Sequence, residues 1–576
     1  MTVLTTLRVW APHAARVEVQ VDGARHPMVS DALGWWSAAV APVHGAEYGF
    51  SLDGTDPRPD PRSAWQPDGV RGLSRVVDHA LFDWQTTTWR GRPLLGQVVY
   101  ELHVGTFTEA GTFDAAIDRL DHLVELGIDF VELLPVAAFP GRHGWGYDGV
   151  FVYAVHEPYG GPTALKRFVD ACHARGLGVV LDVVYNHLGP DGNVLPAYGP
   201  YFTDSYATPW GEAVNYSGAE SDEVRRFTID NAIMWLRDYR IDALRLDAVH
   251  AIIDTSAVHL LEELAAEVRE LSAQVDRPLS LIAETDLNDP RLLISRDAGG
   301  YELDAQWNDD FHHALHTVMT GESFGYYEDF GSFDQLATAL TRGYVYAGAY
   351  SVHRRRRHGR PLPPSITGHR LLGYAQDHDQ IGNRAAGERL SALVSPGMVK
   401  VAAALVLTSP FTPMLFMGEE WAASTPWQYF TDHEDPGLAE AVRTGRRSEF
   451  KAFGWKHEDV PDPQHPTTMQ RSVLQWDELG ARPHADVLGW YRDLIALRRA
   501  TPDLRDGRFD QLAVDVDEAA RVVVLRRPST VVAANLSSAQ VTIELDASAV
   551  LLTSADVVLR RGFVTLPPES VAILAR

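Results

Sequence analysis

Eight short apolar runs, separated by segments with helical periodicity, constrain the fold of this chain more than any other feature of its sequence. Several intervening segments repeat apolar residues every three to four positions, as Phe113, Ile117, Leu120 and Val124 do. Such βα units build parallel sheets, and no Gly-rich phosphate fingerprint accompanies them, so we predict an α/β fold built on a (β/α)8 TIM barrel. The predicted strands span residues 97–102, 130–134, 178–183, 243–246, 280–283, 303–306, 371–376 and 412–417.

The segments on either side of this pattern are rich in β-type alternation. Val17, Val19 and Val21 alternate with polar residues near the start, and valine-rich alternation returns after residue 505. We therefore expect an N-terminal β-sandwich over 1–90, a catalytic barrel with inserted loops over 91–504, and a C-terminal β-domain over 505–576.

Charge and composition exclude several classes of partner. The chain has 51 basic and 77 acidic residues, a formal net charge of −26, which repels nucleic acid and acidic membrane surfaces. The single cysteine, Cys172, excludes an intramolecular disulfide, and its place on a helical face predicts a packing role. No apolar run is long enough for a membrane span, and the N-terminus lacks a signal-peptide pattern, so we expect a cytoplasmic protein. We interpret the basic run Arg354–Arg357 as a solvated loop.

Polar side chains follow four of the predicted strands directly. Barrel enzymes carry their chemistry at these carboxyl ends of the strands. A carboxylate buried there must be solvated, paired or functional, because desolvating an unpaired charge is costly. Four strand ends with carboxylates at one barrel mouth therefore predict a catalytic site. The groups are Asp182 with His187, Arg245 with Asp247 and His250, Glu284 with Asp286, and His378 with Asp379.

Glycoside hydrolysis requires two carboxyl groups in different protonation states, and this set supplies them. Arg245 precedes Asp247 by two residues and therefore lies on the same face of its strand, where a cation stabilises an ionised carboxylate. This suits a nucleophile. Glu284 follows an apolar strand, and there a raised pKa would let it arrive protonated as a general acid.

These four segments resemble, in order, the signature regions of the α-amylase superfamily of glycoside hydrolases. The resemblance covers most of the chain. It implies that Asp247 is the nucleophile, Glu284 the acid/base and Asp379 a third carboxylate that binds sugar hydroxyls. It also implies an aromatic platform for the sugar at Tyr147. Further substrate-binding candidates are Asp182, His187, Arg245, His250, Asp377 and His378.

Two departures from the superfamily pattern concern residues beside the site. Asp377 replaces an Asn that many relatives carry, which leaves the pH optimum open, and Val249 replaces a Lys common in α-amylases, which weakens an assignment as a plain amylase. Asn186 could ligate calcium in amylase-like relatives, but we find no dedicated calcium loop and expect no required cofactor.

An N-terminal sandwich before the barrel resembles the subgroup of branching enzymes, isoamylases and maltooligosyltrehalose trehalohydrolases. The segments 304–313, 380–384, 417–421, 430–433 and 450–455 are, together and in order, similar to trehalohydrolases. This resemblance implies retaining hydrolysis of the α-1,4 bond next to the terminal trehalose of a maltooligosyltrehalose. It also implies a glucan-binding type of N-terminal domain and a functional link to a maltooligosyltrehalose synthase. Candidate contacts to trehalose are Trp307, Asp309, Asp310 and His312.

Two alternatives remain open on the sequence. A glucan branching enzyme shares the catalytic set but passes the glycosyl group to a sugar hydroxyl. A non-catalytic glucan-binding protein would keep the barrel, but it should have lost at least one of the three carboxylates, and all three are present.

Overall fold

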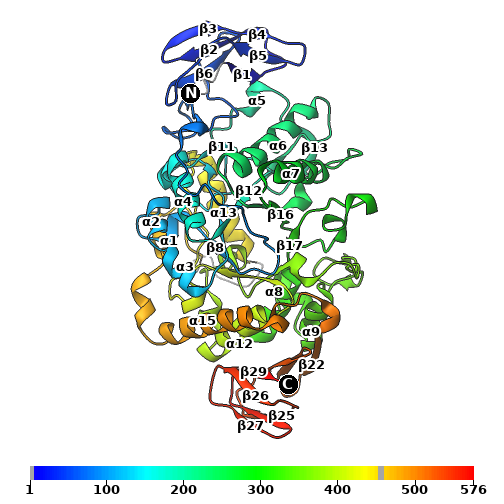
Figure 1. Cartoon of the computed structure of the whole chain (residues 1–576). Coiled ribbons are helices and arrows are strands. Elements are labelled where there is room, and N and C mark those ends of the chain that lie inside the picture. The colour runs from blue at the N-terminus through cyan, green and yellow to red at the C-terminus, as the bar shows by residue number, and fades with distance from the viewer. Residues whose placement is uncertain (1–5, 452–459) are drawn as a thin grey trace.

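A closed barrel of eight parallel strands occupies the middle of the computed structural model, which describes residues 6–451 and 460–576 (Figure 1). Each of the eight predicted runs carries one barrel strand, so the (β/α)8 prediction is confirmed. The predicted trehalohydrolase-like motif 450–455 lies largely outside the described residues. In spatial order the strands are β12 (Gly178–Val183), β15 (Ala243–Leu246), β16 (Ser280–Ala283), β17 (Ala305–Trp307), β20 (Leu371–Gly373), β21 (Thr412–Phe416), β8 (Val99–Leu102) and β9 (Phe130–Leu133).

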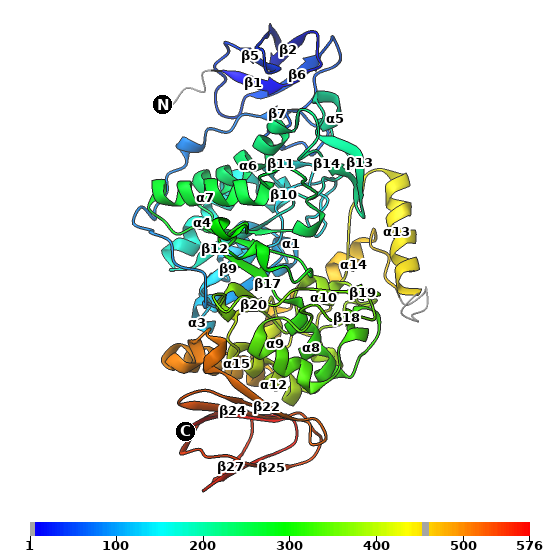
Figure 2. The same ribbon diagram turned by 90° about the vertical axis from the view of Figure 1, so that its right-hand side faces the viewer.

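Apolar side chains from several strands fill the inside of the barrel. Val99, Phe130, Val180 and Ile282 form one buried cluster there. Around the barrel lie the helices α3 (Leu120–Leu126), α4 (Gly161–Ala174), α6 (Ser221–Asp238), α7 (Leu260–Val275), α8 (Asp309–Thr320), α12 (Pro396–Leu407) and α15 (His484–Ala500) (Figures 1 and 2). The free thiol of Cys172 on α4 is fully buried, as its packing role requires.

A glycine ends the helix α3. Gly127 has φ 96°, and a Cβ at this position would lie 2.7 Å from Ile495 on α15. The residue therefore needs both the left-handed backbone and the missing side chain.

Two β-rich units lie at opposite ends of the molecule (Figures 1 and 2). The N-terminal unit has two sheets. The strand order of the first is β1 (Leu7–Trp10), β5 (Trp35–Ala38) and β4 (Val29–Ser30), and that of the second is β3 (Ala24–Pro27), β2 (Val17–Val21), β6 (Glu47–Leu52) and β7 (Ser74–Arg75). The C-terminal unit has a five-stranded and a three-stranded sheet, from β22 (Ala513–Asp517) to β29 (Ser570–Ala575). We propose domain limits at residues 90 and 504 because they fall between these units and the barrel.

Two inserted segments lie on the same side of the barrel. They are the hairpin of β13 (Phe202–Thr208) and β14 (Gly211–Val214), and the helix α13 (Pro436–Lys451) (Figure 2). The basic run Arg354–Arg357 belongs to a third insertion, in which β18 (Tyr350–Ser351) precedes it and its last two residues form β19 (Arg356–Arg357). Arg355 to Arg357 are exposed as expected, but Arg354 is partly buried and pairs with Asp286. Among the described residues, no helix is both long and apolar enough to cross a membrane.

Candidate active site

Arg245 connects the carboxylates at the carboxyl end of the barrel. Its guanidinium is fully buried and donates to Asp247 Oδ1 at 2.7 Å and to Asp182 Oδ2 at 2.9 Å. The register of β12 and β15 places Asp182 directly beside Arg245. The other oxygen of Asp247 accepts a hydrogen bond from Asn186 Nδ2 at 2.7 Å. Two donors therefore orient Asp247 and stabilise its negative charge.

Glu284 lies next to Asp247 but in a different electrostatic state. Its carboxylate is 3.7 Å from Arg245 Nη2 and accepts from the backbone N–H of Ala248 at 2.6 Å. Ala248 has the left-handed φ of 39°, which turns this N–H toward Glu284. Burial raises the pKa of Glu284 well above its ordinary value of 4.5, Arg245 opposes the rise, and neighbouring carboxylates such as Asp247 add to it. The raised pKa of Glu284 favours its protonated form, which a general acid requires.

His378 is held as a cation beneath the site. Its Nδ1 lies 2.5 Å from Glu101 Oε1 and its Nε2 lies 2.8 Å from the Tyr147 hydroxyl. The Tyr147 hydroxyl donates to Asp182, so it must accept from His378, and both ring nitrogens then carry protons. Burial alone would lower the pKa of His378. The negative charge of Glu101, together with the smaller effect of Asp379, outweighs burial and raises this pKa to about 10.

Replacing Glu101 with glutamine is expected to lower the pKa of His378 from about 10 toward its ordinary 6.5. His378 would then lose its proton as the pH rises through neutrality, and Tyr147 would lose a donor. We expect kcat/KM to fall about tenfold more at pH 8 than at pH 6, because one unit of pKa corresponds to a tenfold change in the protonated fraction. The measurement is the pH profile of both proteins.

The exposed Glu109 offers a matched control for this substitution, since Glu109→Gln removes the same charge outside the site. If kcat/KM of the Glu101 variant depends on pH in the same way as that of the wild type, Glu101 does not keep His378 protonated.

A cavity of about 520 Å³ opens above these groups. The expected site residues in its wall are Tyr147, His187, Asp247 and Asp379. Tyr147 stacks on His378 with ring centroids 5.3 Å apart and also lines the cavity. Asp379 is the most open of the three catalytic candidates, with 42% of its side chain exposed.

Two of the expected binding residues, Asp182 and Asp377, are buried at the barrel end and contact neighbouring protein groups. Asp182 is buried against Arg245, and Asp377 is buried with its carboxylate capping the helix α10 (His378–Gly382). His250 is exposed on the short helix after Asp247, where Asp286 is its charged neighbour.

Three of the four expected trehalose contacts are buried as well. Trp307 is only 1% exposed and lies under Arg245, whose guanidinium carbon is 4.4 Å from its ring centroid, so a direct contact with trehalose does not fit. Asp310 is also buried, and its Oδ2 accepts from the backbone of Val345 and Tyr346. His312 is 1% exposed and bonds the Tyr327 hydroxyl.

Asp309 is the trehalose candidate that remains accessible. It is partly exposed at the start of α8, accepts from the Tyr374 hydroxyl, and lies close enough to Glu284 to affect its pKa. Burial raises the pKa of Asp309 to about 7 although the Tyr374 hydrogen bond opposes the rise. Asp309 therefore lies on the same side of the site as Glu284, which we call the acid side.

Sequence reasoning missed the residues that complete the cavity. Trp210 in the β13–β14 turn is 45% exposed and stacks on His187 with ring centroids 5.2 Å apart. Asn383, Tyr429 and Arg446 also line the wall. An exposed tryptophan in a long insertion was the available signal for Trp210. Asn186, considered as a calcium ligand, bonds Asp247, and no metal-binding group of three His, Cys, Asp or Glu residues occurs in the described ranges.

Three segments of the chain match known domain families. Residues 86–197 match the alpha amylase catalytic domain, residues 3–66 match carbohydrate-binding module 48, the isoamylase N-terminal domain, and residues 507–573 match a domain of unknown function. A crystal structure of a putative alpha amylase from Salmonella typhimurium superimposes with a TM-score of 0.91 at 38% identity, covering 99% of this chain and 97% of that one.

Curated relatives narrow the assignment. A malto-oligosyltrehalose trehalohydrolase of Arthrobacter ramosus is 58% identical over 90% of both chains. A 1,4-alpha-glucan branching enzyme of Vibrio cholerae is 34% identical, but over only 42% of this chain and 37% of its own length.

The closed barrel, with Asp247, Glu284 and Asp379 at its carboxyl end, defines a glycoside hydrolase of the α-amylase superfamily. The match to the Salmonella typhimurium structure covers 99% of this chain, so it includes the N-terminal sandwich and the C-terminal β-unit. Within that superfamily, the chain belongs to the malto-oligosyltrehalose trehalohydrolases.

Proposed function

We propose that this protein hydrolyses the α-1,4-glucosidic bond next to the terminal trehalose of a maltooligosyltrehalose, releasing trehalose and a maltooligosaccharide with net retention. The observation that carries the chemistry is the shared contact of Arg245 with Asp247 and Glu284. Asp247, oriented by Arg245, thus lies beside a carboxyl group whose pKa burial has raised. The choice of bond rests on the names of the relatives.

The reaction proceeds in two steps. Asp247 attacks the anomeric carbon while Glu284 donates its proton to the 4-oxygen of the leaving trehalose, which gives a glycosyl ester on Asp247. The deprotonated Glu284 then takes a proton from water, which attacks the same carbon and frees Asp247. Retention of this kind requires carboxyl groups about 5–5.5 Å apart.

Tyr147, His187 and Trp210 are proposed to hold the glucan on the nucleophile side, since all three line the cavity that Asp247 faces. Trehalose would occupy the acid side near Asp309. Asp379 is proposed to bind hydroxyls of the sugar at the cleavage point because its carboxylate is exposed in the cavity wall.

Product analysis tests this function against its alternatives. The protein is incubated separately with maltotriosyltrehalose, maltopentaose and amylose, and the products are separated by chromatography. We expect rapid release of trehalose from the first substrate and slow cleavage of the others. New α-1,6 branches would favour a branching enzyme, and fast cleavage of maltopentaose would favour a plain amylase.

Trp210→Ala is expected to raise KM for maltotriosyltrehalose about 3- to 10-fold while kcat changes less than twofold, because an aromatic contact contributes about 0.5–1.5 kcal/mol to binding. The measurement is steady-state kinetics. Tyr350→Ala is the control, since Tyr350 is a 58% exposed aromatic outside the cavity wall. An unchanged KM would remove Trp210 from the substrate site.

We infer a cytoplasmic setting and a functional link to a maltooligosyltrehalose synthase, which would supply the substrate. The single, buried cysteine supports the first inference because it gives the chain no use for an oxidising compartment. The names of the relatives support the second.

A further inference from the structure

A second cavity lies at the opposite end of the barrel from the catalytic mouth. Its wall includes the residues directly before three neighbouring strands, namely Val98 before β8, Asp129 before β9 and Leu177 before β12. Parallel strands of a barrel all begin at the same end, so this cavity is separate from the site built after the strands. Its volume is about 450 Å³, within the range of pockets that bind small molecules.

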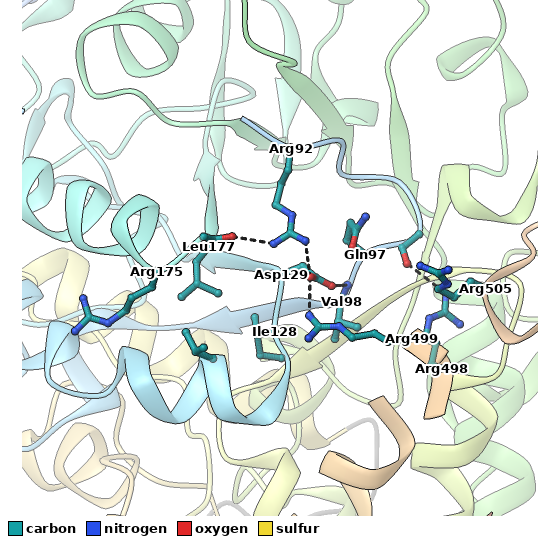
Figure 3. Close-up of a pocket in the computed structure, with 13 residues that line it drawn as sticks. Arg92, Gln97, Val98, Ile128, Asp129, Arg175, Leu177, Arg498, Arg499 and Arg505 are labelled. Carbon is teal, nitrogen blue, oxygen red and sulfur yellow. Dashed lines mark hydrogen bonds and ion pairs between the residues drawn. The ribbon is translucent and has the colours of Figure 1, made fainter. Parts of the chain in front are cut away.

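Arginine side chains from four segments surround this cavity (Figure 3). They are Arg92, Arg175, Arg498, Arg499 and Arg505. Asp129 is the one acidic residue among the described residues of the wall, and it accepts from Arg92 at 2.8 Å and from Arg499 at 2.7 Å. Asp121, outside the wall, pairs with Arg175 at 2.6 Å. Five guanidinium groups against two carboxylates leave an excess of three positive charges.

Two of these arginines have no carboxylate partner among the described residues. Arg498 is 1% exposed, donates to main-chain carbonyls such as that of Leu504 at 2.7 Å, and buries its Nε without a partner. Burial, with Arg527 and Arg505 nearby, lowers the pKa of Arg498 to about 9. Arg505 is exposed at the end of its short helix, and no described residue forms a hydrogen bond or ion pair with its side chain. The protein leaves this charge unneutralised.

Helix ends do not account for the whole excess. The C-terminal ends of α3, α4 and α15 lie at this end of the barrel, where Val124, Arg175 and Arg499 enter the wall. Each such end carries about half a negative charge, so three ends offset about 1.5 charges. More than one positive charge remains, in a protein whose formal net charge is −26.

We propose that this cavity binds a small phosphorylated ligand with at least two negative charges, of the sugar bisphosphate or pyrophosphate type. Guanidinium groups match phosphate oxygens in pairs, which explains why arginine surrounds the cavity. No described residue of the wall is aromatic, so nothing there would stack on a nucleobase. Gln97 supplies an amide for a sugar hydroxyl. The acidic protein as a whole repels larger polyanions such as nucleic acid.

Isothermal titration calorimetry on the full chain, in 0.1 M NaCl, tests this proposal with four probes: fructose 1,6-bisphosphate, pyrophosphate, glucose 6-phosphate and inorganic sulfate. We expect the bisphosphate or pyrophosphate to bind one-to-one with a Kd below about 0.1 mM, at least tenfold lower than the Kd for sulfate. If fructose 1,6-bisphosphate binds more tightly than pyrophosphate, the ligand of the cavity is a sugar phosphate. If pyrophosphate binds more tightly, the ligand is a free polyphosphate.

Arg505→Ala is expected to weaken this binding at least tenfold, and Arg499→Ala to weaken it too. Arg508→Ala is the matched control, because Arg508 lies three residues away, pairs with Asp506 and is outside the wall. Circular dichroism checks that the variants are folded. Absence of binding at 10 mM, or equal affinities of the Arg505 and Arg508 variants, would overturn the proposal.

Discussion

Asp247→Ala is expected to lower kcat for maltotriosyltrehalose by on the order of 10⁵-fold, because removing a catalytic nucleophile eliminates the covalent route and leaves only residual catalysis. The fold should survive the change, since Arg245 keeps its contacts with Asp182 at 2.9–3.0 Å. The measurement is release of trehalose at saturating substrate, with circular dichroism to confirm folding.

Asp477→Ala is the matched control, because Asp477 is exposed and lies outside the cavity wall. A kcat of the Asp247 variant within tenfold of the wild type would show that another group attacks the sugar. Retention can be tested on the same samples, since the anomeric configuration of the released maltooligosaccharide is visible by NMR before it equilibrates.

Glu284→Gln is expected to lower kcat for maltotriosyltrehalose by about 10⁴-fold, because the trehalose oxygen must be protonated to leave and glutamine has no proton to donate. A substrate with a leaving group that needs no protonation, such as a 4-nitrophenyl α-maltooligoside, should still react with Asp247. The hydrolysis step lacks its base, so the glycosyl ester should accumulate. An intact mass raised by the glycosyl group would demonstrate it.

The pH profile provides an independent test of Glu284. Its raised pKa places loss of the proton above 4.5, so in the wild type kcat/KM falls on the alkaline side as Glu284 ionises. This fall should be absent from the Glu284→Gln profile for the activated substrate. Glu322→Gln serves as a control for glutamate loss elsewhere, at a carboxylate paired with Arg384. If kcat/KM of the Glu284→Gln variant still falls on the alkaline side as in the wild type, the titration of another group causes that fall.

Local patterns in the sequence were enough to predict the barrel and the carboxylates at the carboxyl ends of its strands. An apolar run followed by Asp247 or Glu284 fixes both the strand and the end at which the side chain emerges, because strand direction is uniform in the barrel. The fold therefore followed from short segments read one at a time.

Contacts between distant segments could not be predicted in this way. Glu101 and His378 are 277 residues apart and meet because β20, β21 and β8 are neighbours when the barrel closes. Trp307 ends a barrel strand like the catalytic residues, but its large ring fills the space under Arg245. Whether a strand-end side chain points into the cavity or supports a neighbour depends on such packing, which the order of residues does not state.

The two insertions beside the catalytic cavity, the β13–β14 hairpin and α13, bear on how the turnover rate depends on the length of the glucan chains. Trp210 from the hairpin and Arg446 from α13 both belong to its wall, so the mouth is bordered by segments that a continuous glucan strand would have to cross. The end of a chain meets no such obstacle. For a given mass of glucan, the rate of turnover should then depend on how many chains the mass is divided into, and a pool of short chains would be consumed faster than the same pool joined into long ones.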